Sequence, residues 1–356
     1  MTLAEARTLR LAVGTGLCLL FSELTALPLS FAAPALVTVL LGLPLPRLPL
    51  KKAVGLVLAL MLAVYGGMLL LPAVLFYPAA GLLLLALAFY WTFYYTARGG
   101  SPLIGTLATM GIAIATAVGT VNLDLLLVIS SNILAAALIA IVFVWVAHLL
   151  VPDSKAQAGS GAMPAPPEAP QPDLVQARRS AVRSTLIVFP IAIWFLASPG
   201  SLANLPVMIK VAAMGQQARD GGTNAAAKSL LASTLIGGVA AVIGWGVLKI
   251  NPSLVLFALL VALAGLFMGR RIFAGPGLAA DAATWSYGYL TMIVILAPAV
   301  ADSAMGSAAG ASFVSRLLMF VFATIYAVAA VFITNALSPF RERPAPSAVA
   351  GGHDGR

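Results

Sequence analysis

Ionisable side chains within otherwise apolar segments are the residues of this chain best suited to chemistry. Lys210 lies inside one such segment, Glu23 near the end of another, and Arg316 near the start of a third. A charge at the centre of a bilayer costs roughly 2.5–3.5 kcal/mol on insertion scales, so such residues mark binding sites, transport paths or ion pairs. If Lys210 faces the protein interior, its ammonium group is expected to bind an anionic substrate. Alternatively, the ammonium group extends to the inner surface of the membrane. Glu23 and Arg316 are expected at similar depth, as an ion pair or with each reaching the outer interface separately.

Two prolines lie in matching segments that are too short to cross a bilayer. The segments are SFAAPALVTVLLGLP, which contains Pro34, and SLANLPVMIKVAAMG, which contains Pro206. Fifteen helical residues extend about 22 Å, less than the roughly 30 Å apolar core of a bilayer. Because an internal proline removes a helical hydrogen bond, we expect broken helices that surround a substrate site. The alternative is that each proline lies harmlessly in a first turn.

Polar and aromatic residues are mixed on one further predicted helix, 278–299. Asp281, Trp285 and Tyr287 could line a path for a ring-bearing solute, although Asp281 also fits a charge at a helix start. The two histidines and one cysteine form no HExxH or CxxC pattern. There is also no GxxxxGK[ST] phosphate loop, which excludes an ATP-driven mechanism within this chain. We therefore expect no catalytic residues, metal or cofactor.

The composition indicates a membrane protein. Of 356 residues, 61% are apolar and only 9% are charged, against about 25% charged residues in a soluble domain. Soluble, disordered, collagen-like and disulfide-stabilised classes are thereby excluded. The net charge of +9 fits basic cytoplasmic loops. It does not indicate nucleic-acid binding, because no basic run with interleaved aromatic residues is present.

The apolar blocks predict an all-α polytopic membrane protein with about twelve transmembrane helices. They cover residues 11–27, 31–45, 53–71, 78–96, 102–120, 124–150, 183–198, 202–216, 228–248, 252–269, 278–299 and 312–337. If both termini are cytoplasmic, 18 of the 20 basic residues face inward, the exceptions being Lys249 and Arg316. The positive-inside rule therefore supports this topology.

The two halves of the chain echo each other. Matching landmarks recur at offsets of 172 to 178 residues, including Arg10 with Arg183 and Pro78 with Pro252. Six spans per half is an even number, so we expect parallel repeats related by an axis along the membrane normal. The predicted parts are a six-helix repeat (1–151), a flexible cytoplasmic linker (152–176), a second six-helix repeat (177–340) and a polar tail (341–356).

The start of each half resembles a known family. An arginine, a long apolar helix, SFAAPALVTVLLGLP, a basic turn and KKAVGLVLALMLAVYGG follow in order. This pattern is similar to the fusaric acid resistance (FUSC) superfamily of bacterial inner-membrane proteins, with Pro34 and Lys51–Lys52 as matching positions. Phe31 stands for the aromatic residue of the family's second segment. Unlike many members, this chain has only the linker where they carry a large cytoplasmic domain.

The resemblance implies an exporter of organic anions or aromatic acids in the bacterial inner (plasma) membrane. Its expected partners are an anionic or aromatic small molecule, the lipid bilayer and a periplasmic membrane-fusion adaptor, with homo-oligomerisation open and nucleic acid excluded. An anion channel of the same superfamily and a non-transporting membrane assembly subunit are the alternatives. An intramembrane enzyme is disfavoured, because His148 has no nucleophile or metal ligand near it in sequence.

Overall fold

The computed structural model describes residues 2–44, 48–152, 174–197, 205–217, 223–274, 278–304 and 309–336. Most of the predicted linker and the whole polar tail lie outside these ranges. Within them the secondary structure is entirely helical, in the order α1 (Leu3–Leu24), α2 (Ala32–Leu41), α3 (Leu50–Phe76), α4 (Pro78–Ala97), α5 (Pro102–Gly119), α6 (Leu123–Leu150), α8 (Leu174–Ala197), α9 (Leu205–Gln217), α10 (Thr223–Ile250), α11 (Leu254–Ile272), α12 (Ala282–Ala304) and α13 (Ala309–Ala336).

Local sequence signals set several helix starts. Thr2 and Glu5 form a capping box, in which the Glu5 amide donates to Thr2 Oγ1 and the Thr2 amide donates to Glu5 Oε2. Pro78 and Pro102 occupy first-turn positions of α4 and α5, where a missing N–H costs nothing. The capping box starts α1 eight residues before the predicted position, because the charged residues there belong to the helix.

Within the residues that the structure describes, eight helices are long and apolar enough to cross a membrane: α3, α4, α5, α6, α10, α11, α12 and α13. They make the chain a multi-pass membrane protein. The helices α1 and α8 are also longer than 18 residues, but each carries three or more charged side chains. The helices α2 and α9 have only 10 and 13 residues. Twelve crossings therefore stay a prediction.

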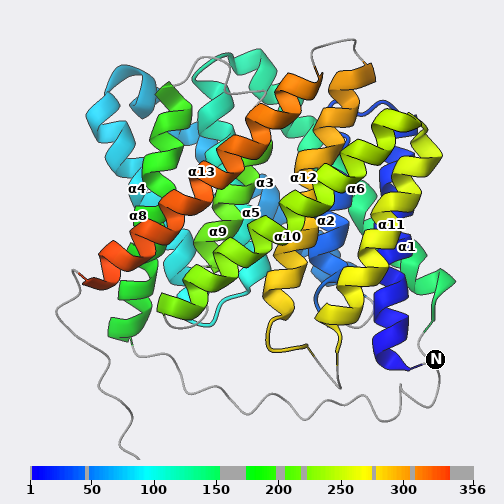
Figure 1. Ribbon diagram of the computed structural model, residues 1–356. Coiled ribbons are helices and arrows are strands. Elements are labelled where there is room, and N and C mark those ends of the chain that lie inside the picture. The colour runs from blue at the N-terminus through cyan, green and yellow to red at the C-terminus, as the bar shows by residue number, and fades with distance from the viewer. Residues whose placement is uncertain are drawn as a thin grey trace, which may run out of the picture.

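The most buried helices lie in the middle of the bundle. Buried residues make up 72% of the apolar stretch of α5 and 67% of that of α12, against 28–39% in the other six candidate spans. Eight of the ten residues of α2 are buried as well. In Figure 1, α10 and α13 cross in front of this centre, whereas α1 and α11 lie at one side and α4 and α8 at the other. The outer helices direct many of their large apolar side chains outward, as a lipid-facing surface requires.

Small residues allow two pairs of helices to pack very closely. A methyl group on Gly67 of α3 would lie 2.5 Å from the Ala115 Cβ atom of α5. A methyl group on Gly237 of α10 would collide with the Gly288 backbone and the Thr291 side chain of α12. Close approach through small residues is a common means of packing helices in membranes. The two most buried long helices, α5 and α12, thus each pack closely against one long neighbour, α3 and α10 respectively.

Candidate functional site

Four helices, α2, α5, α9 and α12, form what we call the central group. The helix α2 packs against α12, while α9 packs against both α5 and α12. At 1.5 Å per residue, the 10 residues of α2 and the 13 of α9 extend about 15 and 20 Å. Neither length matches the roughly 30 Å apolar core of a bilayer. Two short helices are therefore enclosed in the middle of a bundle of long ones.

The prolines do not interrupt these helices. Pro34 is the third residue of α2 and Pro206 is the second residue of α9. The predicted internal break is therefore wrong, and the first-turn alternative holds, because a proline there loses no helical hydrogen bond. Each helix begins one or two residues before its proline, α2 at Ala32 and α9 at Leu205. The side chains of Pro206 and Lys210 lie outside the described part of the structure, so the predicted role of Lys210 stays a prediction.

A buried polar cluster joins α1, α2 and α12. The Thr38 hydroxyl donates to the Pro34 carbonyl at 2.9 Å and lies 3.4 Å from the Thr15 hydroxyl. The Tyr289 hydroxyl donates to the Val261 carbonyl of α11 at 2.9 Å and also contacts Thr15. Each of these polar groups is paired, as buried polar groups must be. The cluster is missed by sequence reasoning, since it combines residues from distant segments.

Gln216, near the end of α9, carries a buried amide of a different kind. Its residue is 1% exposed, and neither Nε2 nor Oε1 has a hydrogen-bond partner among the described residues. A methyl group on Gly105 of α5 would lie 3.0 Å from Gln216 Nε2, so the amide lies at the contact of α9 with α5. An unsatisfied buried amide costs about 1–3 kcal/mol. The sequence signal that pointed to Gln216 was its position, as a glutamine at the end of a short apolar segment.

Asp281 and Trp285 come together, but at the surface. Asp281 is exposed immediately before α12, and its Oδ2 atom accepts a hydrogen bond from Trp285 Nε1 at 2.8 Å. The Arg271 guanidinium lies 5.5 Å from the centroid of the Trp285 ring. Tyr287 is half-buried on α12. The geometry favours Asp281 as a charge at a helix start, and the proposed path role of these residues stays a prediction.

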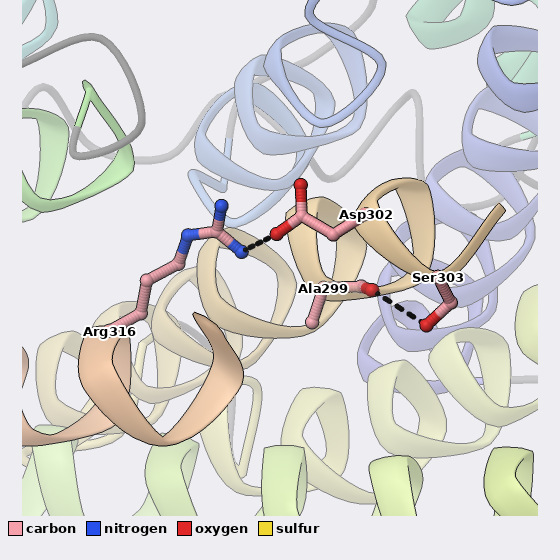
Figure 2. Close-up of polar contacts among 4 residues, drawn as sticks. All are labelled: Ala299, Asp302, Ser303 and Arg316. Carbon is pink, nitrogen blue, oxygen red and sulfur yellow. Dashed lines mark hydrogen bonds and ion pairs between the residues drawn. The ribbon is translucent and has the colours of Figure 1, made fainter. Parts of the chain in front are cut away.

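Arg316 has Asp302 as its ion-pair partner. Nη1 of Arg316 lies 2.7 Å from Oδ2 of Asp302, with side-chain exposures of 8% and 19% (Figure 2). Glu23 lies instead beside Ser30. The predicted pair of Glu23 with Arg316 is therefore not formed among the described residues. The physical reason is helix packing: α1 packs mainly against α2, α6 and α11, whereas α13 packs mainly against α8, α10 and α12.

Comparison with protein families gives a match over residues 7–147 to a family described as "Protein of unknown function (DUF2955)". The matched part runs from the first turns of α1 almost to the end of α6. Neither curated proteins nor solved structures give a match. The chain is thus similar, over the first of its two halves, to a family whose function is not known.

Proposed function

We propose that this chain is a bacterial inner-membrane transporter that exports organic anions, aromatic acids among them. The observation that carries the proposal is the enclosure of two short helices, α2 and α9, beside the two most buried long ones. Short helices in corresponding halves of a membrane protein are typical of transport sites. The resemblance of both halves to aromatic-acid exporters supports the same class and suggests a periplasmic adaptor as partner.

The proposal includes two parallel six-helix repeats, α1–α6 and α8–α13, and twelve crossings. Matching helix contacts support it. The helix α3 packs along α5 as α10 packs along α12, and α1 lies on α11 as α8 lies on α4. Likewise, α2 contacts α12 as α9 contacts α5. Exchanging the two halves thus turns each of these contacts into its counterpart, as expected for a two-fold axis along the membrane normal that passes through the central group.

Charge and polarity favour an anionic substrate. The formal net charge is +9, and the backbone of α9 carries Lys210 at mid-helix. Gln216, on the same helix, adds an amide N–H that can donate to a carboxylate. We propose that the substrate contacts Gln216 and Lys210 as it passes the central group.

Flux into proteoliposomes tests the proposal. The purified chain would be reconstituted, and uptake of labelled phthalate, an aromatic acid with low passive permeability, would be measured with and without an imposed proton gradient. Accumulation against the phthalate gradient supports a coupled transporter. Purely downhill flux indicates an anion channel instead, and flux no greater than in empty liposomes contradicts both and leaves the assembly-subunit alternative.

Gln216→Leu gives the site a matched test, with the exposed Gln176→Leu of α8 as control. Removing an unsatisfied buried amide leaves stability unchanged or raises it. We expect phthalate affinity nonetheless to fall about tenfold, since hydrogen bonds to charged groups contribute about 1.5–3 kcal/mol. Equal flux in Gln216→Leu and Gln176→Leu would remove Gln216 from the path.

A further inference from the structure

Glu23 is an acidic side chain that the proposed substrate contacts do not use. It lies in the last turn of α1, and its residue is half-buried. The Ser30 hydroxyl is within hydrogen-bonding reach of the carboxyl group. The Oε1 atom is nevertheless shielded from solvent and has no hydrogen-bond partner among the described residues. The other titratable group on this part of α1, the buried thiol of Cys18, lies beside Ser22.

The end of a helix is an unfavourable place for a negative charge, because the helix dipole is negative there. A closed turn fixes Glu23 at this end: the Ser22 carbonyl accepts from the Leu27 amide at 3.2 Å, and the Glu23 carbonyl accepts from the Ala26 amide at 3.1 Å. Partial removal from water further disfavours the charged form of a carboxyl group. Binding of a proton, which makes the group neutral, relieves both costs.

The basic residues of α1 and α11 lie at the opposite end of α1. Arg10 precedes Glu23 by thirteen residues, which is about 20 Å along a helix. In α11 the pair Arg270–Arg271 lies in the last turn. That turn meets the start of α1, where Gly269 closely approaches Thr8. The helix α2, which also packs against α1, contains no ionisable residue.

The remaining neighbours supply no cation to the carboxyl group either. His148 lies in the last turn of α6, beside the start of α1. Asp124, in the first turn of α6, is exposed and acidic. Lys249 at the end of α10 lies 6.0 Å from the centroid of the Trp245 ring, and Arg316 is paired with an aspartate of α12. Within the part of the chain that the structure describes, Glu23 therefore has no ion-pair partner.

We propose that Glu23 is a proton-binding site and couples export to the proton gradient. The proposed topology places this end of α1 toward the outer face, and the half-buried residue retains access to water. A proton from the outer water binds the carboxylate and later leaves to the inner water, while the organic anion moves outward. No other reactant is required. The coupling role rests on the proposed export function, whereas proton binding itself is measured without any substrate.

Infrared difference spectroscopy of the purified full chain in nanodiscs, between about pH 5 and about pH 8, tests proton binding. We expect a carbonyl band of a protonated carboxyl group that disappears as the pH rises. Glu23→Gln should remove this band, and Asp124→Asn, an exposed carboxyl-to-amide change, should retain it. Ser30→Ala should move the midpoint upward by about one pH unit, because the carboxylate loses a hydrogen bond. If Glu23→Gln does not fold, Ser30→Ala carries the test.

Phthalate accumulation in proteoliposomes under an imposed proton gradient tests the coupling. Glu23→Gln should keep downhill flux but lose accumulation, since its side chain cannot exchange a proton, whereas Asp124→Asn should accumulate phthalate as the wild type does. A band unaffected by both Glu23→Gln and Ser30→Ala, or full proton-driven accumulation in Glu23→Gln, overturns the proposal. If the wild type carries no phthalate, the export function fails, and the infrared band alone decides proton binding at Glu23.

Discussion

Arg316 of α13 and Asp302 of α12 face each other across the contact of their helices, with Nη1 and Oδ2 2.7 Å apart. Figure 2 shows the two side chains reaching toward one another from separate helices. The Arg316 residue is only 6% exposed. A buried charge is costly without a partner, and this ion pair supplies one while linking α12 to α13.

Removing one member of this pair should destabilise the protein strongly. Arg316→Leu leaves the Asp302 carboxylate without its ion-pair partner, and Asp302→Leu does the same to the guanidinium. Breaking a buried pair typically costs about 3–5 kcal/mol. Unfolding of the purified variants in detergent, followed by circular dichroism, measures the loss.

The control for this prediction is a double variant. Arg316→Leu combined with Asp302→Leu should recover much of the loss, because neither charge is then buried alone. Glu23→Leu combined with Arg316→Leu should show no such recovery. Rescue by the second combination and not by the first would contradict the pairing in the structure.

Adjacent glycines of α3 should respond in opposite ways to the same substitution. A methyl group on Gly67 meets Ala115 Cβ at 2.5 Å, whereas one on Gly66 has no atom within 4 Å. Gly67→Ala should therefore destabilise by about 1–3 kcal/mol through overpacking. Gly66→Ala should be neutral or stabilising by up to about 1 kcal/mol, since alanine favours helices. Denaturant unfolding of both variants in one detergent measures the two changes in the free energy of unfolding.

The second half offers the same comparison. Gly237→Ala of α10 should destabilise, because the added methyl collides with α12. On Gly238 the added methyl makes only an ordinary contact, 3.4 Å from Leu317 Cδ1, so Gly238→Ala is its control. Similar costs for Gly67→Ala and Gly237→Ala would support the repeat, and a stable Gly237→Ala would contradict the close packing of α10 with α12.

The ends of neighbouring helices should lie on opposite sides of the membrane. Cys18 is fully buried, so introduced thiols can be labelled above a low background. Arg98→Cys, after α4, should react with an impermeant reagent only after the inner face is opened. Val121→Cys, after α5, should react in intact cells. Both residues are exposed, and labelling of the two from the same side would contradict the proposed topology.

Helix positions were predictable because long apolar runs have few alternatives, and each of the twelve predicted blocks overlaps a helix of the structure. Side-chain partners were not. Arg316 and Glu23 have matching expected depths, but depth does not say which helices are neighbours. The proximity of Arg10 to His148 likewise depends on α1 meeting α6. Such contacts between distant segments leave no pattern in a single sequence.

Charge reversal on α9 should impair transport of an anion. Lys210→Glu places a negative charge beside the proposed path, so phthalate flux should fall to a small fraction of the wild-type rate. Lys228→Glu, on the exposed face of α10, is the matched control. Proteoliposome uptake at equal protein content measures both, and wild-type flux in Lys210→Glu would assign Lys210 to the membrane surface.

Thiol modification during flux tests most directly whether the substrate crosses the membrane through the central group. Thr38→Cys places a thiol on α2, and Leu85→Cys places an equally buried one on α4, outside that group. We predict that a water-soluble thiol reagent modifies Thr38→Cys and blocks phthalate flux, that phthalate slows the modification, and that Leu85→Cys is unaffected. Phthalate flux that continues while Thr38→Cys stays unmodified would contradict a path through the central group.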